Sequence, residues 1–298
     1  MKAIELSEIF KNFAKVRAVD SLSFSVRGGE IFGLLGPNGA GKTTTIRMMM
    51  NIIYPDSGEI LIFGERLSEE LKERIGYLPE ERGFYKRMKV SDVLTYFGTL
   101  KNMERNYAKK RAEELLEEFE MEKYSQSKVQ ELSKGNQQKL QFLSTILHDP
   151  DLIILDEPFA GLDPVNTKFL KDRMIELQRR GKTIVLSTHQ MDQVERLCKD
   201  ICLINEGKMV LYGNLLDIKK KYGRNSIVLR YKGDLSFLKE NGVKSIEDYG
   251  NYAELHLRRN AKPQKILEEL IQGIEIHKFE VTEPSLNEIF IDVVSSDE

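Results

Sequence analysis

The sequence predicts an α/β fold with a parallel-sheet core, followed by a small α+β domain. Three observations lead to this prediction. Short apolar runs typical of buried strands alternate with longer stretches of helical periodicity through residue 221. A glycine-rich loop, Gly36–Thr43, lies between one such strand and a helix. After Gly223 the pattern changes to short strands and short helices.

Strands of the first domain are expected where apolar or β-branched residues gather between turn signals. These runs are Ala3–Leu6, Leu22–Val26, Glu30–Leu35, Gly58–Ile62, Leu152–Leu155 and Thr183–Ser187. Helical periodicity covers Thr43–Asn51, Met103–Glu122, Leu132–His148 and Val165–Arg180. The last two strands flank a helix, and this order implies a right-handed crossover within a parallel sheet. The many charges of the second helix place it at the surface.

The second domain is expected to begin near residue 223. From Ser226 the order is strand, short helix, two strands, helix and strand, as in a split βαβ sandwich. The last four of these elements are Ser245–Glu247, Ala253–Leu257, Pro263–Gln272 and Glu275–Glu280. The sequence Ser285-Leu286-Asn287-Glu288 has the form of a capping box and predicts one more helix.

Composition favours a cytosolic globular protein. Hydrophobic residues make up 41% and charged residues 31%, and the net charge is −2. This balance predicts no nucleic-acid partner. No apolar run reaches the roughly 18 residues of a membrane-spanning helix, and the N-terminus has no signal-peptide pattern. Cys198 and Cys202 have no neighbouring Cys or His, which favours buried apolar thiols over a metal site or a disulfide.

The loop Gly36-Pro37-Asn38-Gly39-Ala40-Gly41-Lys42-Thr43 predicts a phosphate-binding site. Its glycines let backbone N–H groups turn toward a phosphate, and the following helix N-terminus adds partial positive charge. Lys42 can reach the β- and γ-phosphates, and the Thr43 hydroxyl can bind Mg²⁺. The alternative, a glycine-rich turn that matches by chance, leaves the strand before it and the helix after it unexplained.

Two acidic residues follow the apolar strand Leu152–Leu155. Asp156, at the strand end, can bind Mg²⁺ directly or through water. Glu157 points to the other face and can orient an attacking water or accept its proton. Taken alone, the two residues are equally compatible with solvated acids at a strand terminus. The nearby phosphate loop favours the catalytic interpretation.

A second candidate anion site lies at Leu132-Ser133-Lys134-Gly135-Asn136-Gln137. A hydroxyl and a glycine lie here at the expected N-terminus of a helix, and both are typical of helix N-termini that bind phosphate. An ordinary Ser N-cap is the alternative that these residues leave open. One active site has no evident use for two such helix ends.

Together these motifs resemble the nucleotide-binding subunit of ATP-binding-cassette (ABC) transporters, over roughly residues 2–221. The resemblance implies a P-loop NTPase ABC cassette at 1–223, with a mixed sheet core and a helical subdomain at about 81–150. It also implies a small α+β accessory domain at 224–298. The Walker A loop would supply the nucleotide contacts Gly36, Asn38, Gly39, Ala40, Gly41, Lys42, Thr43 and Thr44.

The same resemblance assigns roles to residues outside that loop. Asp156 would end the Walker B strand, Glu157 would be the catalytic glutamate, and His189 the switch histidine that contacts the γ-phosphate. Phe13 resembles the aromatic residue that stacks on adenine, although a core phenylalanine is the alternative. Glu80 stands where the family's Q-loop carries glutamine, and its carboxylate could still bind Mg²⁺ or a metal-bound water.

The resemblance further implies a head-to-tail dimer, either homodimer or heterodimer. Ser133, Gly135 and Asn136 resemble the family's signature and would contact the ATP held by the other subunit. Asp163, in the sequence Ala160–Asp163, resembles the D-loop that crosses between subunits. ATP hydrolysis would then open and close the dimer and drive a membrane partner.

The implied partner is a separately encoded membrane permease. The segment Glu80–Lys89 lies where such permeases dock, so the chain is expected to be peripheral, at the cytoplasmic face of the membrane. The sequence Glu283-Pro284-Ser285-Leu286 and the order of elements around it resemble an accessory domain of prokaryotic sodium- or drug-efflux ATPases. Export is therefore the expected direction of transport.

Two other classes are alternatives to a transporter ATPase, namely soluble ABC ATPases that act on ribosomes or DNA and non-hydrolysing regulatory proteins. Soluble members that act on ribosomes usually carry two cassettes, and this chain has one phosphate loop. Members that act on DNA insert a long coiled coil between the Walker motifs, which here are separated by an ordinary helical stretch. A non-hydrolysing regulatory protein would be expected to lack the glutamate after Asp156, and Glu157 is present.

Overall fold

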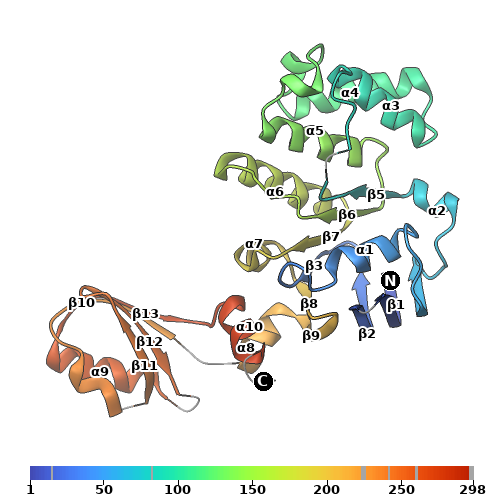
Figure 1. Cartoon of the computed structure of the whole chain (residues 1–298). Coiled ribbons are helices and arrows are strands. Elements are labelled where there is room, and N and C mark those ends of the chain that lie inside the picture. Colours follow the sequence, from blue (N-terminus) through green and yellow to red (C-terminus); the bar gives the residue numbers. More distant parts are fainter. Residues whose placement is uncertain (15, 82, 223–225, 241, 259–260, 295–298) are drawn as a thin grey trace. The chain divides into compact units, whose positions relative to one another are not determined.

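The computed structural model describes residues 1–298 except 15, 82, 223–225, 241, 259–260 and 295–298 (Figure 1). The chain divides into two compact units, Met1–Gly213 and Asn214–Glu298. The first unit has the predicted α/β fold. The second is the smaller α+β unit.

The centre of the first unit is a six-stranded sheet with the strand order β5-β6-β7-β3-β8-β9. Four neighbouring pairs, from β5–β6 to β3–β8, are parallel. Every residue of β3, β6 and β7 is buried, which explains why these strands are continuous apolar runs in the sequence. The strands are β3 (Ile31–Leu35), β5 (Ile75–Leu78), β6 (Leu152–Asp156), β7 (Thr183–Thr188), β8 (Asp200–Asn205) and β9 (Lys208–Asn214).

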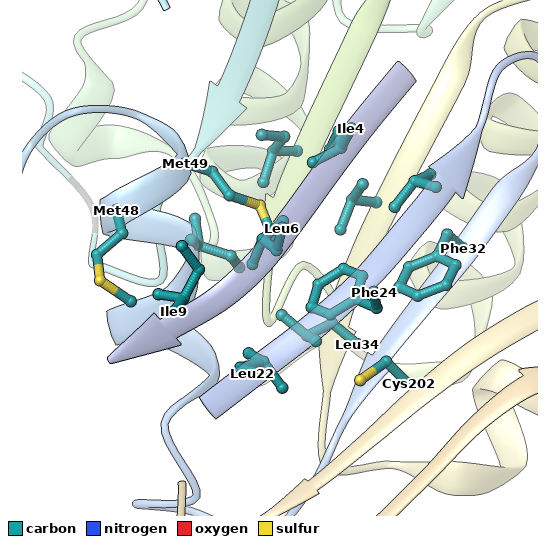
Figure 2. Packing of buried hydrophobic residues seen from close by; sticks show 14 of the residues in the cluster. Ile4, Leu6, Ile9, Leu22, Phe24, Phe32, Leu34, Met48, Met49 and Cys202 are labelled. Carbon is teal, nitrogen blue, oxygen red and sulfur yellow. The ribbon is translucent and has the colours of Figure 1, made fainter. Parts of the chain in front are cut away.

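A second, antiparallel sheet of three strands has the order β2-β1-β4. Its strands are β1 (Lys2–Phe13), β2 (Val16–Arg27) and β4 (Ser57–Ile62). Buried side chains of β1 and β2 pack against those of β3, β8 and the helix that follows β3 (Figure 2). Phe24 and Phe32, for example, are stacked with ring centroids 5.5 Å apart. This core fixes the position of the glycine loop that leaves β3.

Seven helices accompany these sheets in the described part of the first unit. Between β5 and β6, helices α3, α4 and α5 gather beyond the sheet edge, within the range expected for the helical subdomain (Figure 1). No helix among the described residues is both long and apolar enough to cross a membrane. The helices are α1 (Lys42–Met49), α2 (Glu69–Glu73), α3 (Val90–Leu100), α4 (Arg105–Glu118), α5 (Lys134–Ile146), α6 (Pro164–Arg179) and α7 (Met191–Leu197).

Helix capping explains where two helices differ from their predicted bounds. The carboxylate of Glu104 accepts hydrogen bonds from the backbone N–H groups of Asn106 and Tyr107, so α4 begins after Glu104. Ser133 caps α5 by accepting from the backbone N–H of Asn136. Short 3₁₀ turns, η1 (Glu122–Tyr124) and η2 (Val129–Glu131), occupy the connection between the two helices.

The second unit is an antiparallel four-stranded sheet with the order β11-β12-β10-β13. This strand order is that of the predicted split βαβ sandwich. Leu229 and Leu255 face the core formed with Ile266 and Leu270 of α9. The elements are α8 (Leu215–Tyr222), β10 (Ser226–Lys232), η3 (Ser236–Glu240), β11 (Val243–Asp248), β12 (Tyr252–Leu257), α9 (Pro263–Gly273), β13 (Glu275–Thr282) and α10 (Leu286–Val294).

The capping box predicted for the last helix is present. The hydroxyl of Ser285 accepts from the backbone N–H of Glu288 at 3.2 Å, and the Glu288 carboxylate accepts from the backbone N–H of Ser285 at 2.7 Å. The division between the units falls before α8, whereas the expected boundary at residue 223 falls after it. The lysine run Lys219–Lys221 is the charged last turn of a helix that buries Leu215 and Ile218.

Both cysteines are buried, as predicted. Burial raises the pKa of the Cys198 and Cys202 thiols, so both stay protonated. Cys202 packs in the core between the two sheets of the first unit.

Candidate active site

The glycine loop joins β3 to α1, and two of its glycines are required by their surroundings. Gly36 has a φ of 150°, and a Cβ there would lie 2.1 Å from the carbonyl oxygen of Ile204. Gly41 has a φ of 105°, and its Cβ would lie 2.4 Å from the carbonyl oxygen of Ala18. Any side chain at either position would therefore clash with backbone.

Positive charge gathers at the start of α1, from the N–H groups of the helix and from Lys42. This helix has no side-chain N-cap and no acidic residue in its first turn, so its first N–H groups point outward for an anion. Lys42 is buried, and its Nζ donates to the carbonyl oxygens of Gly36 at 2.8 Å and Pro37 at 3.1 Å. The same Nζ lies 3.7 Å from Oε1 of Glu157.

A cleft of about 620 Å³ opens at this loop, and the structure gathers eight predicted site residues in its lining. These are Asn38, Gly39, Gly41, Lys42, Thr43, Thr44, Glu80 and Glu157. Two other predicted loop residues have structural contacts: Gly36 accepts from Lys42, and buried Ala40 accepts from the backbone N–H of Gly207 at 3.0 Å.

The carboxylate of Asp156 fits a bound cation. It is fully buried at the end of β6, and within the described residues neither of its oxygens has a hydrogen-bond partner. Burial raises its pKa, and the hydroxyls of Ser187 and Thr43 beside it oppose that shift. The two hydroxyls are neutral, so this buried carboxylate still calls for positive charge. Thr43 and Glu80, which line the cleft, are oxygen ligands of the type that Mg²⁺ prefers.

Glu157 is held by the end of the neighbouring strand β7. Its backbone turns with a φ of 48°, which separates its side chain from that of Asp156. Thr188 Oγ1 donates to Oε2 at 3.1 Å, and the backbone N–H of His189 donates to Oε1 at 3.0 Å. Nδ1 of His189 lies 2.9 Å from the same Oε1. His189 therefore reaches the cleft through its contact with Glu157.

Phe13 lies near the cleft but is not among its described lining residues. The residue is 47% exposed, and its ring centroid lies 5.5 Å from Lys11 Nζ. Val16, which pairs with Phe13 across the turn from β1 to β2, does line the cleft. The adenine-stacking role of Phe13 stays a prediction.

Four predicted residues form a separate group at the starts of α5 and α6. Ser133 is the exposed N-cap of α5, and Asp163 is the N-cap of α6. Asn166 connects them: its Nδ2 donates to Asp163, and the same amide would lie 2.7 Å from a Cβ on Gly135. Asn136 completes the group by donating its N–H to Ser133. None of the four lies among the described lining residues of this chain's own cleft.

The sequence did not predict four of the residues that line the cleft, or one hydrogen bond that links α5 to the residue after Glu157. Val16, Arg17, Ala18 and Glu206 also line the cleft. The dipeptide Glu206-Gly207 signals a turn, but its approach to the loop is set by distant pairing of strands. The link is Gln138 of α5, whose Nε2 donates to the carbonyl oxygen of Pro158, directly after Glu157.

Two family models match the chain. One, described as ABC transporter, matches residues 19–160. The other, described as ATP-binding protein DrrA1-3-like, C-terminal domain, matches residues 213–294. The two matches fall largely on the two units of the structure.

Individual relatives agree with these matches. The chain is 42% identical over 294 residues to "Uncharacterized ABC transporter ATP-binding protein YhaQ" of Bacillus subtilis, covering 98% of this chain and 99% of the relative. It is 40% identical to "Nod factor export ATP-binding protein I" of Paraburkholderia xenovorans, over 71% of this chain and 70% of the relative. A solved "Structure of ATP binding subunit of ABC transporter" matches with a TM-score of 0.68 and 31% identity, over 74% of this chain and 93% of that one.

Proposed function

The chain belongs to the ATP-binding subunits of ABC transporters and is an ATPase of that family, and from this premise we propose that it dimerises on ATP to drive export through a separate membrane subunit. One observation carries the proposal. Most of the predicted phosphate residues and Glu157 line one cleft, whereas the signature and D-loop residues form a second group with Ser133 and Asp163 exposed, outside the described lining of that cleft.

In the proposed site, ATP lies in the cleft with its phosphates on the glycine loop. The N–H groups at the start of α1 and the ammonium of Lys42 bind the phosphates. Thr43, Asp156 and Glu80 would hold Mg²⁺, which neutralises phosphate charge. Val16 and Phe13 lie on the side where the base would stack.

Glu157 is the proposed general base for the attacking water. Its carboxylate is 7% exposed and is oriented by Thr188 and His189, so it is held in place before the reaction. We assign His189 two tasks: it positions Glu157 through Nδ1, and its half-exposed ring can contact the γ-phosphate.

The second group is proposed to complete the site of another subunit. The Ser133 hydroxyl and the start of α5 present donors at an exposed helix N-terminus. Asn166 ties this start to Asp163, and Gln138 ties α5 to the backbone beside Glu157. When the start of α5 closes on the partner's ATP, these contacts would couple that movement to the position of Glu157 in the same chain.

Complementation between two inactive variants tests this shared site. Lys42→Ala removes the phosphate lysine, and Ser133→Arg blocks the signature group. In a mixed dimer one site carries both changes and the other carries neither. Coexpressed chains with distinguishable tags, purified as the mixed dimer, are therefore expected to regain ATP hydrolysis that neither variant shows alone.

The matched control pairs Lys42→Ala with Glu157→Gln. Both residues line the cleft of the same chain, so every site of that mixed dimer is damaged and activity is expected to stay absent. Recovery in the control, or no recovery in a stable mixed dimer of the test pair, would show that Ser133 does not act on the partner's nucleotide.

A pair of exposed tyrosines in the helical subdomain is an argument for the proposed membrane partner. Tyr85 and Tyr96 are 57% and 37% exposed, and their rings meet edge to face at 5.9 Å. Exposed aromatic rings beside one another are typical of protein interfaces. Tyr85 follows Glu80 closely in the sequence, so a permease contact at Tyr85 would be joined to the nucleotide cleft by a short segment of chain. The export activity named for the Nod factor relative favours export here.

The docking surface is tested by membrane association. With docking at Tyr85, the chain would be peripheral at the cytoplasmic face, as subunits of this family associate with a permease. Tyr85→Ser is expected to reduce the fraction of chain that sediments with host membranes and to leave detergent-free ATPase activity unchanged. Tyr107→Ser, an equally exposed tyrosine on α4, is the control. Equal sedimentation of both variants would contradict this assignment.

A further inference from the structure

We propose that the second unit binds a first-row divalent transition metal, such as Zn²⁺, through Glu247, Glu254 and His256. The three residues come from β11 and β12. One ligand atom from each lies within 4.8 Å of the others, close enough for a single ion to contact all three after small side-chain movements. The site lies wholly within residues 214–298, apart from the residues assigned to ATP.

The strand register places these side chains together. Glu247 pairs directly with Glu254, and His256 follows two residues along β12, on the same face. The alternate residues Ala253 and Leu255 are buried in the core on the other face. Nε2 of His256 lies 3.4 Å from Oε1 of Glu247. The imidazole and the glutamate pair therefore converge from adjacent strands.

Two carboxylates directly opposite each other are unfavourable in an antiparallel pair. Like charges at such positions repel and destabilise the sheet. The described cationic side chains form no ion pair with Glu254, and within the same residues Glu247 pairs with His256 itself. A divalent cation between the two carboxylates would convert this repulsion into attraction.

Each candidate ligand also has an outer partner that would hold it toward a metal. The hydroxyl of Tyr249 donates to Oε2 of Glu247 at 3.3 Å, and that of Tyr252 donates to Oε1 of Glu254 at 2.5 Å. These bonds leave the second oxygen of each carboxylate for the ion. Hydrogen-bonded ligands of this kind are typical of protein metal sites.

The histidine has the same arrangement. Its Nδ1 lies 3.3 Å from the Ser226 hydroxyl and 3.6 Å from Oε1 of Glu288, while Nε2 faces Glu247. A carboxylate or hydroxyl on one ring nitrogen fixes the tautomer and presents the other nitrogen to a metal. A cavity of about 270 Å³ borders Glu247, His256 and Glu288, with room for water as a further ligand.

The donor set selects the type of metal. One imidazole nitrogen with two carboxylates suits Zn²⁺ and its first-row neighbours, whereas Mg²⁺ and Ca²⁺ prefer oxygen alone. Binding would also reach α10, because Glu288 contacts His256 through Oε1 and caps the helix through Oε2. The metal would thus fix the start of the last helix to the sheet.

Calorimetric titration of the full-length chain with Zn²⁺, without nucleotide or Mg²⁺, tests the site. We expect one site whose affinity falls at least about tenfold in His256→Ala and in Glu254→Gln. The second variant keeps the shape and hydrogen-bonding capacity of the side chain, so a loss of affinity there does not come from unfolding. Co²⁺ in place of Zn²⁺ should give a visible absorption band that both variants lose.

Two controls separate this site from other ligands in the chain. His277→Ala removes an exposed histidine on β13 of the same unit, and Asp156→Asn removes the carboxylate assigned to Mg²⁺. Both are expected to keep the wild-type affinity for Zn²⁺. Absence of Zn²⁺ binding by the wild type, unchanged binding in His256→Ala, or loss of binding in either control would overturn the proposal.

Discussion

The imidazole of His189 and the carboxylate of Glu157 are in direct contact, with Nδ1 2.9 Å from Oε1. The backbone N–H of His189 donates to the same oxygen, and Lys42 Nζ lies 3.7 Å from it. Glu157 is thus oriented mainly by the strand next to its own. Movement at the end of β7 would change the aim of the proposed base without moving β6.

Glu157→Gln is expected to reduce ATP hydrolysis by about 10²- to 10⁴-fold, because an amide cannot accept the proton from water. ATP binding should persist, since the glycine loop and Lys42 are unchanged. We also expect a nucleotide-bound dimer to accumulate, which sizing chromatography with ATP would detect. Near-normal hydrolysis by this variant would show that Glu157 is not the general base. An ATP-bound monomer would contradict the proposed dimer.

Alanine substitutions at Gly36 and Gly39 would distinguish the cost of a steric clash from the cost of backbone strain in the phosphate loop. Both have positive φ, but a Cβ at Gly36 meets the Ile204 carbonyl at 2.1 Å, whereas a Cβ at Gly39 meets no atom within 4 Å. Gly39→Ala is expected to cost about 1 kcal/mol of unfolding free energy. Gly36→Ala should cost more than about 3 kcal/mol, because backbone must move. Urea unfolding of both variants provides the measurement; equal losses would mean that the Ile204 contact relaxes freely.

The active-site elements that could be predicted from the sequence have signals contained in a few consecutive residues. Gly36–Thr43 carries its own spacing, and Asp156 directly ends a strand that is apolar throughout. Glu206 offers no such signal, since it lines the cleft from the turn after β8, where the backbone N–H of Gly207 donates to the carbonyl oxygen of Ala40. Contacts that depend on the pairing of distant segments cannot be read from local pattern.

The second unit illustrates the same limit. The order of its strands and helices along the chain, and the capping box of its last helix, could be predicted from local signals. Its start could not, because the residue pattern changes only after the charged run Lys219–Lys221. Only the packing of Leu215 and Ile218 shows that this run ends a helix.

His148, just after α5, is a partly buried histidine that does not line the nucleotide cleft. Its Nε2 bonds with the carbonyl oxygen of Ile75 at 3.2 Å, and its Nδ1 is buried without a hydrogen-bond partner in the described residues. Burial, with the nearby charge of Lys101, lowers the pKa of His148 from 6.5 to about 4. A second proton would have no acceptor, so the folded protein keeps this ring neutral.

This lowered pKa makes stability depend on pH in a defined window. Between pH 6.5 and 4 the unfolded chain protonates His148 and the folded chain does not, so stability is lost as pH falls through this range. The full loss amounts to about 3 kcal/mol. His148→Gln keeps a donor for the Ile75 carbonyl but cannot titrate. Between pH 7 and 4 the unfolding free energy of this variant should therefore fall by about 3 kcal/mol less than that of the wild type. His277→Gln, at an exposed histidine, should retain the wild-type pH dependence. Parallel pH profiles for wild type and His148→Gln in urea unfolding would show that His148 protonates equally in both states.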